Sequence, residues 1–182
     1  MQTHSGQRHS GQRGITLIEI CLVMAISGIV AGTAVPGMRG LLDGRRLGGA
    51  ATQLATDIQF VRTEAIVRNQ AVRLSFHANA GSSCYVIHTG AAALCSCDAS
   101  GPAVCSAGAE QIKTVHFPAL EKVALEANVG SVLFDPLHGT SSPTATLRVI
   151  GADGGEVHHV INIMGRVRSC TPHGAVAGYR PC

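Results

Sequence analysis

Cysteines are the residues of this chain whose type and spacing most directly suggest chemistry, and the sequence contains seven of them. Six lie beyond the first third of the chain: Cys84, Cys95, Cys97, Cys105, Cys170 and Cys182. An even number favours disulfides in an oxidising compartment, and proximity pairs Cys170 with Cys182 and leaves the other four to pair among themselves. Those four could instead bind zinc, but one residue between Cys95 and Cys97 is a tighter spacing than paired zinc thiolates use. The cysteine pattern therefore predicts disulfides and no metal site.

No combination of side chains in the sequence indicates catalysis. The nine histidines are scattered, and the adjacent pair His158–His159 would point to opposite faces of a strand and could not chelate one ion together. No serine–histidine–aspartate or cysteine–histidine arrangement has a recognisable local context, and no glycine-rich phosphate loop follows a predicted strand. We therefore expect no enzyme activity, no catalytic residue and no cofactor.

Positive charge is concentrated at the C-terminal end of the chain. Residues 157–182 contain Arg166, Arg168 and Arg180 and no acidic residue. In an extended chain the guanidinium groups of Arg166 and Arg168 would lie on the same side, about 6.6 Å apart, and both could reach one DNA backbone. A bond between Cys170 and Cys182 would hold Arg180 close to them. The spacing alone fits an ordinary solvated strand end equally well, so it leaves both interpretations open.

The composition excludes an intrinsically disordered chain, because 46% of the 182 residues are hydrophobic and only 14% are charged. The net charge of +3 is too small to mark a nucleic-acid-binding protein by itself. Much of the apolar content lies in residues 15–35, which read ITLIEICLVMAISGIVAGTAV and carry one charge, Glu19. As a helix this run would be about 31 Å long, enough to cross a membrane. Arg8 and Arg13 precede it and favour a cytoplasmic N-terminus, with the rest of the chain on the other side.

A secretory signal peptide is a poor alternative for this run, which is longer than a signal peptide's apolar region and contains an acid. A carboxylate within an apolar span is costly and usually functional. The stretch RGITLIE, followed by an apolar helix, resembles the class III leader of type IV pilins and pseudopilins. The resemblance implies that a prepilin peptidase cuts between Gly14 and Ile15 and methylates Ile15. It also implies that Glu19 pairs with the N-terminal amine of a neighbouring subunit during assembly. The family most often has Phe at the position of Ile15.

The same resemblance implies a division of the chain into three segments. Residues 1–14 would be the leader peptide, and residues 15–35 a transmembrane and assembly helix. Residues 36–182 would form a periplasmic pilin-like globular domain that includes the second half of the long helix. The protein would lie in the inner membrane as a single-pass protein and then enter a pilus or pseudopilus.

The elements that position these residues can be read from the hydrophobic pattern. Apolar residues recur at three- and four-residue spacing from Leu47 to Ala65, so we expect a helix that ends near Arg68 and packs on a sheet. Strands are predicted at residues 71–76, 84–89, 111–117, 131–134, 144–150 and 156–164. Asp153-Gly154-Gly155 predicts a tight hairpin turn, and residues 78–83 and 91–109 are predicted to be loops. The predicted fold class is α+β, with a long N-terminal helix, transmembrane and then amphipathic, packed on an antiparallel sheet as in pilins.

Three further stretches resemble the FimT/GspH group of pilin-like proteins: RTEAIVRNQAVRLSF at 62–76, FDPLHGTS at 134–141 and TATLRVIGADGGEVHHVINIMGRVR at 144–168. A Gly-Arg-x-Arg tail beside a C-terminal cysteine pair is similar to the FimT branch, which is implicated in DNA uptake. This implies a minor pilin that captures double-stranded DNA for natural transformation through Arg166, Arg168 and Arg180. The alternative is a GspH-type pseudopilin of a type II protein secretion system. The implied partners are the prepilin peptidase, other pilins or pseudopilins, the inner-membrane assembly platform, the membrane and DNA.

Overall fold

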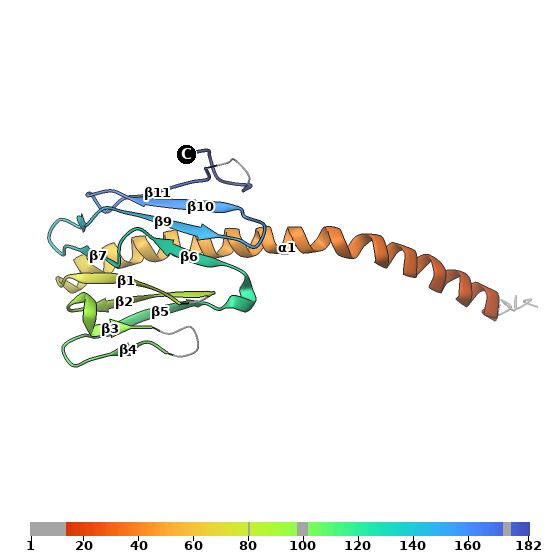
Figure 1. Cartoon of the computed structure of the whole chain (residues 1–182), viewed down its shortest axis with the longest axis horizontal. Helices are drawn as coiled ribbons and strands as arrows, with labels where there is room; N and C mark the ends of the chain where they lie inside the picture. Colours follow the sequence, from red (N-terminus) through yellow and green to blue (C-terminus); the bar gives the residue numbers. More distant parts are fainter. Residues whose placement is uncertain (1–13, 80, 98–101, 173–175) are drawn as a thin grey trace, which may run out of the picture. The chain divides into compact units, whose positions relative to one another are not determined.

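The computed structural model describes residues 14–79, 81–97, 102–172 and 176–182 (Figure 1). The chain divides into two compact units, Met1–Arg39 and Gly40–Cys182. Helix α1 (Leu17–Arg68) contributes to both units, whereas every strand of the described residues belongs to the second unit.

In the first unit, the described part of α1 is an apolar helix without a core of its own. All its side chains from Leu17 to Thr33 are exposed, and Leu17, Met24 and Ile29 are 81%, 71% and 69% exposed. In the residues that the structure describes, no helix combines the length and the hydropathy needed to cross a membrane. The span predicted at residues 15–35 therefore stays a prediction.

In the second unit, one face of α1 is buried. The buried residues follow the three- and four-residue spacing of an amphipathic helix: Leu47, Ala51, Leu54, Ile58, Val61 and Ala65. The helix ends at Arg68 because Asn69 adopts a φ of 49°, the left-handed conformation that Asn tolerates after a helix. The amide of Gln70 then donates to the carbonyl of Ala65 at 3.2 Å. This is the packed half of the helix that the sequence predicted.

The strands form two antiparallel sheets and a small hairpin (Figure 1). The five-stranded sheet has the order β5 (Gln111–Phe117), β2 (Ser82–Thr89), β1 (Val72–Asn79), β7 (Ser131–Phe134), β8 (Ser141–Ser142). The four-stranded sheet has the order β11 (Val167–Cys170), β10 (Glu156–Ile161), β9 (Ala145–Ile150), β6 (Ala124–Ala127). The hairpin pairs β3 (Cys95–Ser96) with β4 (Val104–Cys105). Two short 3₁₀ turns, η1 (Ala92–Leu94) and η2 (Ala119–Glu121), complete the unit.

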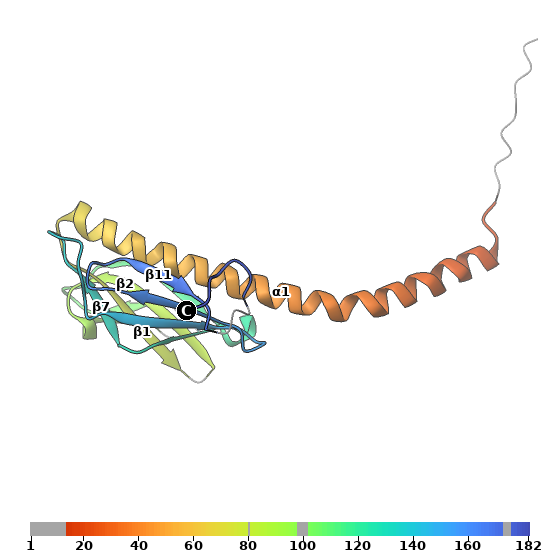
Figure 2. The same cartoon turned by 90° about the horizontal axis from the view of Figure 1, so that it is seen from above.

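Both sheets turn apolar side chains toward the second half of α1, which lies along them (Figure 2). Leu74 and Phe134 come from the five-stranded sheet, and Leu147 and Ile161 come from the four-stranded sheet. All four are fully buried in the same cluster as the helix stripe. Alternating burial along β9 shows that its other side chains face away from this core. The fold is therefore α+β, an N-terminal helix packed on antiparallel sheets, which confirms the predicted class.

One charged residue also lies on the buried face of the helix. Asp57 is 3% exposed and accepts hydrogen bonds from the Tyr85 hydroxyl at 2.7 Å and from Nζ of Lys113 at 2.6 Å. Burial and the neighbouring carboxylate raise the pKa of Tyr85 well above its usual value. Since Tyr85 is on β2 and Lys113 on β5, the Asp57 carboxylate fastens α1 to two strands of one sheet.

Several predicted boundaries were wrong. Residues 91–109 were predicted to be a loop, but the structure forms η1 and the β3–β4 hairpin there, and a disulfide joins Cys95 to Cys105 across that hairpin. The strand predicted at 156–164 ends at Ile161 because a tight turn follows it. The sequence analysis also missed β6, β8 and β11, which are short strands of two to four residues.

Candidate functional site

The predicted processing residues lie just before α1. Gly14 and Ile15 are exposed and precede the first helical residue, Leu17. The predicted leader comprises residues 1–14, of which residues 1–13 lie outside the described part of the chain. A bond between Gly14 and Ile15 is thus in non-helical, accessible chain, as a peptidase requires.

Glu19 lies in the first turn of α1 and is exposed. Its backbone amide donates to the carbonyl of Thr16 at 3.1 Å. A carboxylate in this turn interacts favourably with the positive end of the helix dipole. The side chains around it are mostly apolar and exposed, and among the described residues 14–33 Glu19 is the only charged one.

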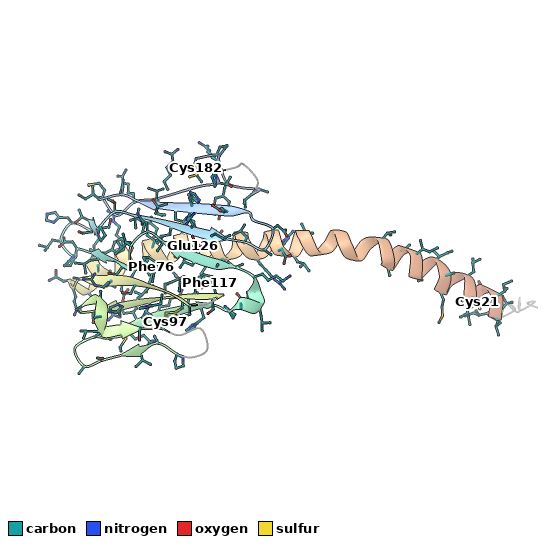
Figure 3. All side chains as sticks on the ribbon, in the orientation of Figure 1. Cys21, Phe76, Cys97, Phe117, Glu126 and Cys182 are labelled. Atoms are coloured by element: carbon teal, nitrogen blue, oxygen red, sulfur yellow. A yellow bond between two sulfur atoms is a disulfide. The ribbon has the colours of Figure 1, made fainter. Side chains whose placement is uncertain are left out.

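The structure joins the six domain cysteines in three disulfides. Cys84 bonds Cys97, Cys95 bonds Cys105, and Cys170 bonds Cys182. The first ties the end of the β3 segment to strand β2, and the second joins β3 to β4 within the hairpin; their cysteines belong to a second small cluster of buried residues. The third lies at the far side of the domain from Cys97 (Figure 3) and closes the C-terminal segment against β11.

The three arginines predicted to bind DNA, Arg166, Arg168 and Arg180, lie on or beside strand β11. Arg166 and Arg168 are exposed; Arg168 is on β11, whereas Arg166 is in the turn before it rather than in a strand. The carbonyl of Arg180 accepts from the amide of Thr171 at 2.9 Å, directly after β11, which holds the backbone of Arg180 beside that strand. The structure therefore brings Arg180 to the strand that carries Arg168.

Some arginines of the domain form ion pairs with acids, whereas Arg45, Arg62 and Arg73, like the three near β11, form none with the residues that the structure describes. Arg68 forms ion pairs with Glu64 and Glu110, and Arg148 forms one with Glu126. In the part of the chain that the structure describes, no acid forms an ion pair with Arg166, Arg168 or Arg180. Their guanidinium groups can therefore bind an external anion, and the planar group suits a phosphate.

The turn that carries Arg166 is fixed by hydrogen bonds that the sequence analysis missed. The Asn162 amide donates to the Arg166 carbonyl at 3.1 Å, and Asn162 Oδ1 accepts from the amides of Met164 at 3.1 Å and Arg166 at 3.0 Å. Gly165 has a φ of 67°. A three-residue loop that ends in a left-handed glycine is a common hairpin connection, so Asn-x-x-Gly between two apolar runs could have predicted it.

Gly165 is required at its position for a second reason. A Cβ there would collide with the carbonyl oxygen of Gly139 in the β7–β8 loop and would press on the side chain of Arg62. Nε of Arg62 also donates to that carbonyl at 3.0 Å. Gly165 thus allows the β10–β11 turn, the β7–β8 loop and the side chain of Arg62 on α1 to pack closely together.

Two buried histidines, His88 and His159, form hydrogen bonds within the sheets. His159 is buried, its Nδ1 lies 2.8 Å from Oγ of Ser169, and burial lowers its pKa to about 4. His88 is buried with its Nε2 at 2.8 Å from Oγ of Ser75, and burial likewise lowers its pKa. Among the described residues, no three His, Cys, Asp or Glu side chains come together as a metal site.

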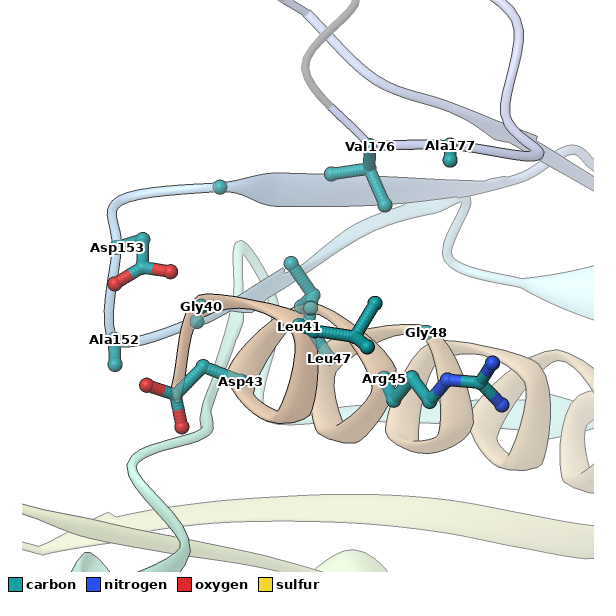
Figure 4. A pocket seen from close by; sticks show the side chains of 13 residues that line it. Gly40, Leu41, Asp43, Arg45, Leu47, Gly48, Ala152, Asp153, Val176 and Ala177 are labelled. Carbon is teal, nitrogen blue, oxygen red and sulfur yellow. The ribbon is translucent and has the colours of Figure 1, made fainter. Parts of the chain in front are cut away.

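A hollow of about 600 Å³ lies between α1, the β9–β10 turn and the C-terminal segment (Figure 4). Leu47 and Val176 supply apolar walls, and Asp43 and Asp153 lie at one side. None of the predicted site residues lines it.

Comparisons with known proteins give two family matches. The family described as "Type II transport protein GspH" matches residues 50–165, which is more than half of the chain. The family described as "Prokaryotic N-terminal methylation motif" matches residues 9–35. Over 65 residues the chain is 45% identical to the pilin-like protein PilA1 of Thermus thermophilus; the match covers 35% of this chain and 39% of that protein. No solved structure matches the chain.

Proposed function

This chain belongs to the GspH family of pilin-like proteins, and from that membership we propose that it is a minor pilin that enters, or primes, a type IV pilus and captures double-stranded DNA. The exposed apolar helix from Leu17 to Val30, joined to an N-terminal methylation motif, carries the assembly part of the proposal. A helix that is apolar on all sides needs lipid or other helices around it. The inner membrane before assembly, and the helices of neighbouring subunits after it, would supply that cover.

Processing is the first step to test. Prepilin peptidase would cut after Gly14 and methylate Ile15, and mass spectrometry of the protein from membranes should find a chain that begins with methylated Ile15. Gly14→Ala should keep the leader attached, whereas Gly28→Ala, at a helical glycine with open space around it, should be processed normally. An unprocessed wild-type chain in a host with the peptidase would refute this step.

Glu19 would act after processing, when the subunit leaves the membrane for the filament through the assembly platform. Pairing with a neighbour's N-terminal amine is strong in a low-dielectric setting, so Glu19→Val should remain in the membrane but be missing from sheared filaments. Glu121→Val, at an exposed acid of η2, is the matched control and should enter filaments. Recovery of Glu19→Val filaments at the wild-type level would contradict the assembly role.

DNA capture is supported by Arg166, Arg168 and Arg180, which form no ion pair with any residue that the structure describes. Two or three phosphate contacts predict a dissociation constant in the micromolar range or weaker and a salt slope of about −2 to −3. Such weak binding is sufficient if several subunits of one filament hold the same duplex. Arg166→Gln/Arg168→Gln should abolish the binding, and the corresponding Lys variant should retain part of it.

The control for net charge is Arg45→Gln/Arg46→Gln, which removes two exposed arginines of α1. It should bind DNA almost as well as the wild type. Equal losses in both double variants would mean that total charge, rather than the C-terminal edge, attracts DNA. A wild-type protein that fails to shift duplex DNA at low salt would end the DNA proposal.

A second candidate function is a pseudopilin of a type II secretion system, favoured by the match to the family described as "Type II transport protein GspH". Deletion of the gene separates the two. Loss of natural transformation with normal protein secretion supports the pilus, and loss of secretion with normal transformation supports the pseudopilus. Neither outcome changes the expected cleavage after Gly14.

A further inference from the structure

The turn before the arginines presents two large apolar side chains to solvent. Ile163 and Met164 form the tip of the β10–β11 hairpin and are 64% and 54% exposed. Leu137, in the neighbouring β7–β8 loop, is 76% exposed. The two loops are joined by Ser141, whose amide donates to the Ile163 carbonyl at 2.9 Å. One end of the domain therefore carries an apolar tip, defined here as Ile163 and Met164.

This tip is held rigidly. Besides the two hydrogen bonds to Asn162 Oδ1, the amide of Gly165 donates to the Asn162 carbonyl at 2.9 Å, and Oγ of Ser141 donates to the same carbonyl at 2.6 Å. Gly165 is buried against the β7–β8 loop. Exposed apolar side chains that lie close together commonly mark an interaction site, and a pre-organised backbone lowers the entropy cost of binding.

The chemistry around the tip selects its partner. Arg166 and Arg168 follow Met164 by two and four residues. Residues 157–182 contain no acid. An apolar wedge flanked by cations is the combination with which proteins enter the minor groove of DNA, where Ile, Leu or Met separates a base step while Arg holds the phosphates.

We propose that the apolar tip inserts into the minor groove of double-stranded DNA, with Met164 and Ile163 against a base step and the arginines on the flanking phosphates. This inference rests on the proposed DNA capture and specifies how the duplex is held. The preferred ligand would be duplex DNA with easily unstacked pyrimidine–purine steps, because these cost least to open. Binding would therefore have an apolar component that salt does not screen, in addition to the ionic one.

The test uses the full chain in detergent and a short duplex that carries 2-aminopurine beside a TA step. Wild type should raise the 2-aminopurine fluorescence as it binds. Ile163→Ser/Met164→Ser should weaken binding about tenfold, leave the salt slope unchanged and abolish the fluorescence rise. Arg166→Gln/Arg168→Gln should instead flatten the salt slope.

The matched control is Val104→Ser/Leu120→Ser, since these side chains are 69% and 89% exposed on other elements. This control should bind as the wild type does. Unfolding temperatures should be equal for the wild type, the tip variant and the control, because all four replaced side chains are exposed.

The outcomes separate this inference from the proposed function. If wild type binds DNA through the arginines but the tip variant keeps full affinity and the fluorescence rise, the groove insertion is wrong and DNA capture stands. If the tip variant binds DNA normally but is lost from filaments, or loses binding to phosphatidylglycerol vesicles instead, the tip contacts a subunit or a lipid surface. If wild type does not bind DNA at all, both proposals fail.

Discussion

His159 should make the folded domain sensitive to acid. Its ring is fully buried on β10, where burial is the main cause that lowers its pKa from 6.5 to about 4, and positive charge on the neighbouring His158 adds to the effect. In the unfolded chain the ring takes up a proton below about pH 6.5, whereas in the folded domain it resists protonation until about pH 4. We therefore expect acid to act on stability through this residue.

The sign and size follow from proton linkage. Between the two pKa values the unfolded state binds more protons than the folded state, so the free energy of unfolding falls as the pH falls. With these pKa values, protonation of His159 in the unfolded chain lowers the free energy of unfolding by about 2 kcal/mol between about pH 7 and about pH 5. The decrease reaches about 3 kcal/mol by about pH 4. Burial also lowers the pKa of His88, which adds a contribution of the same sign.

Urea denaturation measures this effect on a fragment that begins at Gly40, which contains the whole buried core of the described residues. The comparison is between pH dependences, because His159→Gln also changes stability at neutral pH through its bond to Ser169. Between about pH 7 and about pH 5, the free energy of unfolding of His159→Gln should fall by about 2 kcal/mol less than that of the wild type. Equal pH dependences in wild type and His159→Gln would refute the reasoning.

Three other changes test the packing under the proposed site. Gly165→Ala should lower the free energy of unfolding by more than about 1 kcal/mol in urea denaturation, because the new Cβ is strained at positive φ and also collides with a backbone carbonyl. Gly154→Ala is the control, since Gly154 has a φ of 74° but open space around it, and it should show the effect of the strain alone. Asp57→Ala should cost about 3 kcal/mol in thermal unfolding, since it leaves Lys113 and a buried hydroxyl without their acceptor; a loss below about 1 kcal/mol would contradict this. Cys182→Ser opens the Cys170–Cys182 disulfide, which has a sequence separation of 12, and should lower the free energy of unfolding by about 3 kcal/mol in urea denaturation without reductant; an unchanged free energy would contradict this.

Features that depend on near neighbours could be predicted from the sequence. The leader motif around Gly14 is a short linear pattern, and the methylation-motif match covers it. The packed half of α1 was predicted because its apolar stripe repeats every three or four residues, and its end near Arg68 was predicted as well. The fold class followed, because a helix with one apolar face needs a sheet to cover it. All these properties are set by residues within one or two turns of each other.

Only the tertiary structure decided which distant residues meet. The four central cysteines have no pairing preference in the sequence; strand β2 places Cys84 beside Cys97 and leaves Cys95 to Cys105. The burial of Asp57 was hidden because its partners lie on strands far along the chain. The Gly-Arg-x-Arg stretch reads as one continuous strand, yet contact with Gly139 and Arg62 makes its first half a rigid turn. Such contacts depend on the three-dimensional packing of elements, which residue spacing along the chain does not encode.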